Sequence, residues 1–305
     1  MRFSHVINPF PAPPAGEHGR AQAITYAALR RALADAEKHG LAAELLAVTF
    51  PGEEAAIEPP ARALPLLKNR VSDVAPLSGS APYPLLDEIL ALAHAEGHGD
   101  YVVFTNMDIC PQPYFYRALA EMLEGGGEQA LVIPRRTISA EFTTPRELEA
   151  MYRETGIPHE GFDCFVFPRA WIPRFDLRRL CIGIPSFDLA LILNLEAMTH
   201  FRTRVLWEQF LTFHLGDEKS WKTRAELNAH NLAEARAIAA QLEQDHGPIP
   251  PCSKFEFIRV WLTQERRPRA PALDRIWNRL RQETSQWRNR WLVRKFRREL
   301  ALPNW

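Results

Sequence analysis

The segment YVVFTNMDICPQPYFY, residues 101–116, holds the pattern that decides the fold. Its first five residues, Tyr101 to Thr105, are apolar or β-branched and do not alternate with polar residues. Such a run predicts a strand that is buried on both faces, as in a parallel sheet. Asn106 and Asp108 come immediately after it, before a proline-interrupted segment. The sequence thus places an amide and a carboxylate two positions apart at the end of a buried strand.

Strands and helices alternate on both sides of this segment, which is typical of a parallel sheet built from βαβ units. We therefore predict an α/β fold with a mixed, mostly parallel sheet flanked by helices. Strands are predicted at 2–7, 42–50, 64–71 (weaker), 101–105, 129–134, 163–168 and 203–207. Helices are predicted at 21–40, 83–97, 111–127, 185–198, 222–247 and 272–300. We expect a domain at 1–221 and a helical C-terminal extension at 222–305.

Composition is that of a soluble globular protein, with 46% hydrophobic and 24% charged residues among 305. The four cysteines are far apart, so neither a disulfide framework nor a zinc knuckle is expected, and a reducing compartment is the default. The N-terminus lacks the pattern of a signal peptide. The longest apolar-rich stretch, at 187–198, carries charge and is too short to span a bilayer. These features predict a cytoplasmic protein.

Asn106 and Asp108 point to the same side of the strand end, because side chains two residues apart share a face. Ligands of open α/β sheets bind beyond the carboxyl ends of the strands. Carbonyl and carboxylate oxygens suit Mg²⁺ or Mn²⁺ held together with a pyrophosphate. The alternative is that Asp108 only starts a turn or caps the next helix.

The segment VVFTNMDI, together with the Rossmann-like first half, resembles the nucleotide-sugar-dependent glycosyltransferases of the GT-A fold. LLDEIL and GFDCFVFPR resemble bacterial proteins of this kind, and the resemblance covers roughly residues 1–221. It implies transfer of a sugar from a nucleoside-diphosphate sugar to an acceptor hydroxyl, on a glycan or a lipid-linked molecule, with Mn²⁺ or Mg²⁺ assisting. Asn106 stands where the family's D-x-D motif has its first acid. That departure favours the alternative, a non-catalytic protein that binds sugar nucleotides or glycans.

Other enzyme classes are disfavoured by the absence of their motifs. The chain has no G-x-G-x-x-G, no P-loop, no H-E-x-x-H and no G-x-S-x-G motif. A nucleotidyltransferase shares the sheet but usually has a glycine-rich loop after its first strand. Here that loop is the proline-rich NPFPAPPAGEHG, so we rank this third hypothesis last.

The resemblance also implies roles for four residues further along the chain. Asp188, at the start of the helix predicted at 185–198, corresponds to the general base of inverting members, and Asp163 is the rival base or an acceptor-binding residue. His214 corresponds to a third metal ligand. Lys219 comes soon after, at a distance from which it could reach a phosphate. The alternatives are a carboxylate favoured by the helix dipole, a hydrogen-bonded histidine and a solvated lysine.

The remaining candidates line the expected donor pocket. Asn8 and Pro9 end the first strand and should border the nucleotide base. Lys68, Arg70 and Asp73 come after the weaker strand; Asp73 could accept a hydrogen bond from the base or ribose, and Arg70 could face the diphosphate. Arg135 and Arg136 come after the strand at 129–134 and suit an anion. For each of these charged residues, an ordinary surface charge is the alternative.

The C-terminal region has its own charge pattern. Between Arg266 and Arg298 there are twelve Lys or Arg and two Asp or Glu, although the whole chain has 37 of each. Trp277, Leu280, Thr284, Trp287 and Trp291 recur at helical spacing and form one stripe. The stripe either lies in an anionic membrane surface at 273–298, which predicts a peripheral protein at the inner face of the membrane, or docks onto the acidic body. Nucleic acid is less favoured because the body is acidic.

Overall fold

A computed structural model describes residues 1–78, 81–124, 130–159, 161–216, 223–248, 258, 262 and 272–303. Its centre is a seven-stranded sheet with the order β10-β6-β9-β4-β1-β2-β3. The strands are β1 (Arg2–Ile7), β2 (Ala42–Ala47), β3 (Arg62–Ala63), β4 (Tyr101–Thr105), β6 (Leu131–Ile133), β9 (Cys164–Pro168) and β10 (Arg204–Val205). Only β9 is antiparallel to its neighbours within this sheet. The mixed, mostly parallel sheet predicted from the sequence is confirmed.

A second, smaller sheet has the order β5-β11-β7-β8. Its strands are β5 (Cys110–Pro111), β11 (Thr212–Leu215), β7 (Arg136–Ile138) and β8 (Ile157–Pro158). β5 and β7 begin within a few residues of the ends of β4 and β6. The small sheet therefore continues the chain from the carboxyl edge of the large one, and it carries β11 to that edge.

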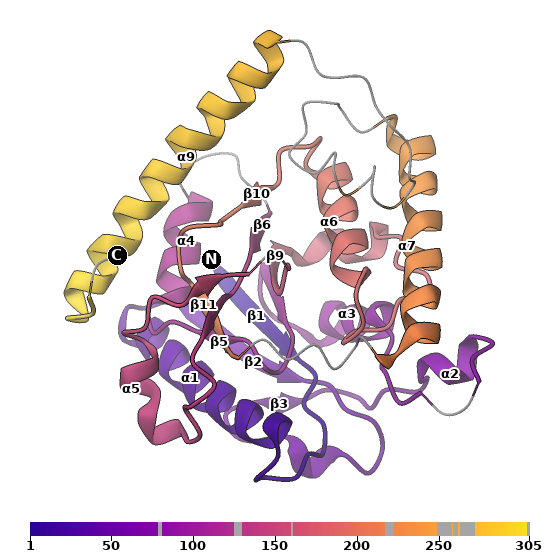
Figure 1. Cartoon of the computed structure of the whole chain (residues 1–305), viewed down its shortest axis with the longest axis horizontal. Coiled ribbons are helices and arrows are strands. Elements are labelled where there is room, and N and C mark those ends of the chain that lie inside the picture. Colours follow the sequence, from indigo (N-terminus) through magenta and orange to yellow (C-terminus); the bar gives the residue numbers. More distant parts are fainter. Residues whose placement is uncertain are drawn as a thin grey trace.

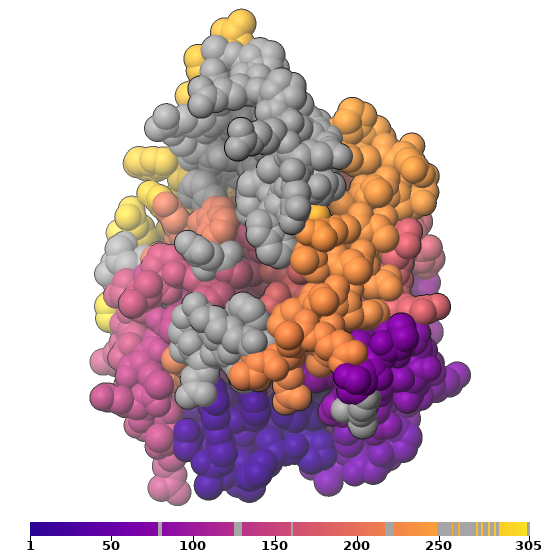
Figure 2. All heavy atoms as spheres, turned by 45° about the vertical axis from the view of Figure 1, so that its right-hand side comes forward, coloured from indigo at the N-terminus to yellow at the C-terminus, as the bar shows by residue number. Residues whose placement is uncertain are grey.

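Helices cover both faces of the large sheet (Figure 1). One face is covered by α3 (Leu86–Glu96), α6 (Phe187–Met198) and α7 (Ala225–His246), the last of which lies at the surface (Figure 2). The other is covered by α1 (Glu17–Lys38) and α4 (Phe115–Glu124), with α9 (Ala272–Glu299) outside α4. Short helices are α2 (Val71–Val74), α5 (Leu148–Met151) and the 3₁₀ turns Glu54–Ala56, Pro145–Glu147 and Arg169–Arg174.

The central strands contribute side chains to two separate cores because successive residues point to opposite faces. In β4, Val102 and Phe104 pack in the core beneath α3 and α6, whereas Val103 packs in the core beneath α1 and α4. All three are fully buried. This double burial explains why the run Tyr101 to Thr105 does not alternate polar with apolar.

The one polar residue of that run that is fully buried, Thr105, belongs to a hydrogen-bonded group behind the strand end. His5 of β1 contacts the Thr105 hydroxyl through Nε2 at 2.9 Å and the Tyr116 hydroxyl of α4 through Nδ1 at 2.8 Å. Burial lowers the pKa of His5 to about 3, so the ring is neutral. The group fixes the end of β4 relative to β1 and α4.

Three features differ from the sequence expectation. The strand predicted at 64–71 is wrong: β3 covers only Arg62–Ala63, and Pro65 comes soon after, which cannot donate to a ladder. α1 begins at Glu17, four residues earlier than predicted. The sequence indicated a strand-like run ending at His214, which is β11, but it did not predict the small sheet, because its strands are two to four residues long and carry no periodic signal.

α9 docks onto the body through one face of its C-terminal part. Leu292, Val293 and Phe296 are buried. The ring of Phe296 stacks on Tyr114 at 5.9 Å and lies 4.6 Å from the Arg117 guanidinium. No helix within the described residues is both long and apolar enough to cross a membrane.

The predicted tryptophan stripe is not the docking face of α9. Trp287 and Trp291 are 74% and 61% exposed. The prediction that the tryptophan stripe docks onto the body is therefore wrong for Trp287 and Trp291. The side chain of Trp277 lies outside the described part of the chain.

The docking of α9 predicts opposite outcomes for two aromatic residues five positions apart on the same helix. Phe296→Ala should destabilise the protein by about 3 kcal/mol, since it empties a packed aromatic site. Trp291→Ala should change the free energy of unfolding by less than about 0.5 kcal/mol, because its side chain is mostly in water. Urea unfolding followed by circular dichroism measures both. Equal effects would contradict the docking geometry.

Candidate active site at the carboxyl edge of the sheet

Five segments of the chain meet at one edge of the large sheet. β1, β2, β4 and β6 run parallel, so Asn8, Phe50, Asn106 and Arg135 all come after strand ends at the same edge. β9 runs the other way, and its first residue pairs with Ile133 and Thr105. Asp163, immediately before β9, therefore arrives at this edge from the opposite direction.

Asp108 pairs with His214 from the small sheet. His214 Nε2 lies 3.2 Å from Asp108 Oδ2, and His214 Nδ1 lies 2.9 Å from the Gly216 carbonyl oxygen. A carbonyl oxygen can only accept a hydrogen bond, so the Nδ1 atom of His214 must carry a proton to bond to Gly216. This bond orients the ring so that the Nε2 atom faces the Asp108 carboxylate. The contact rules out a role for Asp108 limited to neighbouring backbone groups, because its partner is 106 residues away.

The two groups hold each other charged. Burial acts to raise the pKa of Asp108, but the hydrogen bond and charge of His214, then the charge of Arg135, bring it below its ordinary value. Burial acts to lower the pKa of His214, but the hydrogen bond and charge of Asp108 bring it above its ordinary value. Each group therefore favours the charged form of the other.

The second carboxylate oxygen of Asp108 lacks a hydrogen bond of this kind. Asp108 Oδ1 is buried and has no hydrogen-bond partner within the described residues. An unpaired buried carboxylate oxygen is costly and calls for a cation or donor from outside. β4 ends at Thr105 and residues 106–108 lie in the turn after it, so the shared strand face predicted for Asn106 and Asp108 is wrong. The half-buried amide of Asn106 and the imidazole of His214 are the other donor groups considered for a metal. This donor set suits Mn²⁺ or Mg²⁺ completed by ligand oxygens.

The described residues contain no group of three or more His, Cys, Asp or Glu side chains placed to hold a metal. Asp108 and His214 make two, and Asn106 is an amide. Mg²⁺ is usually held by one or two carboxylates plus substrate phosphates, so a metal at this position would need oxygens from a bound ligand.

Arg135 links Asp108 to the next carboxylate. Its guanidinium lies 2.8 Å from Asp163 Oδ1, and the two side chains are 11% and 9% exposed. The charge of Arg135 also acts on Asp108 and His214. His159 Nδ1 lies 3.9 Å from Asp163 Oδ2. Arg135 is therefore the cation at the centre of the site.

Asp188 is the third carboxylate, in the first turn of α6. Burial is the main reason that its pKa is raised from 3.8 to about 6, and the negative charge of Asp163 adds to the effect. Backbone N–H groups of Leu189 and Phe162 act in the opposite direction. Phe162 immediately precedes Asp163, so the Asp188 carboxylate contacts the backbone next to Asp163. A carboxyl with a pKa near 6 suits proton transfer near neutrality.

The donor-pocket candidates are spread along the same edge. Asn8 is buried and donates from Nδ2 to the Val48 carbonyl at 2.6 Å, which joins the ends of β1 and β2; Pro9 beside it is buried. Arg70 is half-buried, with its guanidinium 4.3 Å from the centre of the Phe50 ring.

Three candidates are exposed or bound to other parts of the protein. Asp73 accepts from the Arg70 backbone N–H at 2.7 Å, which is the local capping arrangement of α2, and its side chain is exposed. Lys68 is exposed. Arg136 donates to the Thr155 and Gly156 carbonyls and stacks on Phe210, so it holds the small sheet together. Lys219 lies outside the described residues.

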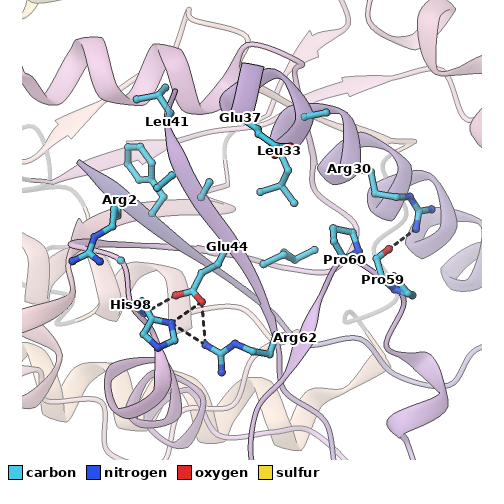
Figure 3. Close-up of a pocket in the computed structure, with 16 residues that line it drawn as sticks. Arg2, Arg30, Leu33, Glu37, Leu41, Glu44, Pro59, Pro60, Arg62 and His98 are labelled. Carbon is cyan, nitrogen blue, oxygen red and sulfur yellow. Dashed lines mark hydrogen bonds and ion pairs between the residues drawn. The ribbon is translucent and has the colours of Figure 1, made fainter. Parts of the chain in front are cut away.

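A groove of about 890 Å³ lies elsewhere, between the second half of α1 and the starts of β1 and β2 (Figure 3). Three of its charged or titratable side chains, Glu44, Arg62 and His98, contact one another. Glu44 contacts Arg62 and His98 at 3.0 and 3.2 Å. Burial acts to raise the pKa of Glu44, but bonds from Ser4, His98 and Arg62 lower it to about 2. This groove is at the amino end of the strands and holds none of the candidate residues.

No family model and no curated protein matches the sequence, but several solved structures have a similar fold. A mannosyltransferase from Pyrobaculum calidifontis, solved with GDP-Man and Mn²⁺, superposes with a TM-score of 0.52 and 16% identity, covering 86% of this chain and 69% of that one. The fold is that of the GT-A glycosyltransferases. The fold prediction made from VVFTNMDI is thereby confirmed.

Two further solved structures were found. Staphylococcus aureus TarS, solved with UDP-GlcNAc, has 12% identity and a TM-score of 0.48 over 86% of this chain and 72% of that one. Glucosyl-3-phosphoglycerate synthase from Mycobacterium tuberculosis, solved with Mn²⁺, UDP and phosphoglyceric acid, has 17% identity and a TM-score of 0.46 over 78% of each chain. At these identities the likeness is one of fold.

Sequence reasoning placed Asp108, His214, Asp163 and Asp188 separately, and the structure brings their neighbourhoods together. It did not foresee that Arg135 pairs with Asp163. The signal was present in the antiparallel pairing of β6 with β9, which sets Ile133 opposite Cys164. Strand order is not readable from hydrophobic patterns, so the pairing could not be inferred.

The Asp108–His214 pair makes a prediction that needs no substrate. Asp108→Asn removes the negative charge that raises the pKa of His214, leaving burial to lower it. The imidazole should then titrate at lower pH than in the parent protein, as measured by NMR of ring carbon-bound protons. Asp100→Asn, at the other end of the same strand, should leave the His214 titration unchanged. An unshifted His214 in Asp108→Asn would contradict the pair.

Proposed function

We propose that the protein is a glycosyltransferase that moves a sugar from a nucleoside-diphosphate sugar to an acceptor hydroxyl on a glycan or lipid-linked molecule. The observation that carries the proposal is the unpaired, buried Oδ1 of Asp108 at the end of a central strand, beside His214 and Arg135. The GT-A fold supports it, because the carboxyl edge of the sheet is where an open α/β fold binds ligands.

In this proposal Asn106, Asp108 and His214 hold a divalent cation together with the donor diphosphate. A cation at this position would neutralise charge on the departing nucleoside diphosphate. Arg135 lies beside the same carboxylate and supplies a fixed positive charge. Asp108 raises the pKa of His214, so a metal bound at the Nε2 atom would compete with the proton there. Metal affinity should therefore fall as the pH is lowered.

Asp188 takes the role of general base in the proposal. A raised pKa makes it a stronger proton acceptor than an ordinary aspartate while it remains ionised at neutral pH. Asp163 is the weaker candidate, since its carboxylate is already engaged by Arg135 at 2.8 Å. Asp163 then serves to orient Arg135 and to raise the pKa of Asp188. Asn8, Pro9 and Arg70 border the nucleotide.

The metal and diphosphate role of Asp108 is tested by substitution. Asp108→Ala should reduce donor hydrolysis and transfer by about 10²-fold or more, as loss of a charged group in a site that stabilises a leaving group does. A panel of UDP- and GDP-sugars with Mn²⁺ measures it, and thermal unfolding measures stability. Asp100→Asn serves as the control, with full activity. If Asp108→Ala lost stability in parallel with activity, the role of Asp108 would be structural.

The base role of Asp188 predicts a pH signature. Because the ionised carboxylate is the active form, kcat/KM should fall as the pH is lowered through about 6. Asp188→Asn should lower kcat by about 10²–10⁴-fold and abolish that limb. The same variant should unfold at a higher temperature than the parent at pH 7 to 8.

The stability gain follows from linkage. The pKa of Asp188 is higher in the folded protein than its ordinary 3.8, so ionisation disfavours the fold increasingly from pH 3.8 to about 6. The asparagine removes this penalty, which is absent below pH 3.8. A variant that is less stable at every pH would contradict the raised pKa.

A second candidate is a non-catalytic protein that binds sugar nucleotides on this scaffold. Asn106, in place of an acid, favours it because the described residues provide no cluster of three acidic, histidine or cysteine ligands. Calorimetry with UDP and GDP, with and without Mn²⁺, separates the two when combined with turnover assays. Binding without turnover across many acceptors would support this candidate.

A further inference from the structure

The first three quarters of α9 carry an apolar stripe that faces away from the body. Five of the nine large hydrophobic side chains that are exposed in the described residues lie on this one helix: Leu273 (71%), Ile276 (54%), Leu280 (49%), Trp287 (74%) and Trp291 (61%). The intervals between them are three, four, seven and four residues, so they share one face. At 1.5 Å per residue the stripe is about 27 Å long.

This stripe is distinct from the face that docks α9. Leu292, Val293 and Phe296 are buried against the body, and their positions project from roughly the other side of the helix. α9 thus has two apolar faces, of which only one is covered by the described part of the protein. Figure 1 shows α9 on the flank of the molecule, with α4 between it and the sheet. An exposed apolar strip of this length marks a binding surface.

The charges at the end of the stripe identify its partner. Arg294 and Arg298 come seven residues after Trp287 and Trp291, so they continue the same face, and Lys295 adjoins them. All three side chains are exposed. Arg294 and Arg298 make no ion pair within the part of the chain that the structure describes. Arg290, which flanks the stripe, pairs with Glu208 of the body.

We infer that this stripe, defined as Leu273, Ile276, Leu280, Trp287 and Trp291, binds the surface of a membrane that contains anionic lipids. Aliphatic and indole side chains enter the boundary between headgroups and acyl chains, and arginines at the same face meet lipid phosphates. The helix lies flat on the surface. This inference is independent of the proposed glycosyl transfer.

Other occupants fit less well. In a parallel pairing with a second copy, Arg294 and Arg298 would face their own like charges. In an antiparallel pairing, they would be buried against the apolar side chains of Leu273 and Ile276, which is costly. Nucleic acid would use the tryptophans for stacking but gains little from Leu273, Ile276 and Leu280, because aliphatic side chains offer no ring to a base.

The test is co-sedimentation of the full chain with vesicles of phosphatidylcholine, with and without phosphatidylglycerol. Binding should require phosphatidylglycerol and weaken as salt is added, because the basic side chains are exposed. Trp287→Glu and Trp291→Glu should each weaken binding by about tenfold, equivalent to about 1.4 kcal/mol. Arg294→Gln combined with Arg298→Gln should weaken it toward the level seen with phosphatidylcholine alone.

Ile157→Glu is the matched control, since Ile157 is 72% exposed but lies on β8, outside α9. It should bind vesicles like the parent protein. Thermal unfolding of the Trp287→Glu and Trp291→Glu variants should match the parent, because both side chains are exposed. A large fall in unfolding temperature would show that the stripe is covered in solution and would overturn the inference.

Two further outcomes would also overturn it. Binding that is equal on both vesicle types, or absent from both, removes the anionic membrane as partner. A dimer of the parent protein in light scattering that Trp287→Glu converts to a monomer would assign the stripe to a second copy. Competition by an oligonucleotide at physiological salt, lost in the same variants, would assign it to nucleic acid.

Discussion

The contact between Asp108 and His214 is the constraint around which the candidate site is organised. Asp108 stands at the end of the large sheet and His214 on the small one, so a single 3.2 Å contact joins the two sheets at the point where a ligand would enter. Each partner favours the charged form of the other, with Arg135 adding to the effect on Asp108, whereas burial favours the neutral form of both. Whatever binds there must replace this electrostatic balance with another.

The neighbouring carboxylates also depend on how few positive charges lie close to them. Three carboxylates, on Asp108, Asp163 and Asp188, approach one edge, and the cations near them in the described residues are Arg135 and His214. Arg135 is shared between the first two, which leaves Asp188 facing the negative charge of Asp163. The raised pKa of Asp188 is thus in part a consequence of how one guanidinium is positioned. Positive charge is therefore distributed unevenly among the three carboxylates.

Much of this arrangement could be predicted from sequence. The run Tyr101 to Thr105 indicated a buried strand because its residues do not alternate, and this placed Asn106 and Asp108 at its end. The first-turn position of Asp188 was also predicted, because the apolar pattern of α6 is long and regular. Long-range pairing could not be predicted, as with Arg135 and Asp163, because it depends on strand order. The prediction for 64–71 failed because Pro65 interrupts the ladder: Leu64 and Leu67 still donate to the Ala47 and Thr49 carbonyls, but no continuous strand forms.

The position of β9 has a consequence for how the protein folds. β9 lies between β6 and β4, so these two earlier strands share no hydrogen bonds and cannot join until residues 164–168 insert between them. This insertion pairs segments that are tens of residues apart in the sequence. Such long-range pairing slows folding, because the entropy cost of closing each loop comes before the stabilising contacts form. Arg135 and Asp163 flank the inserting segment. The ion pair between them therefore requires β9 to be paired with β6.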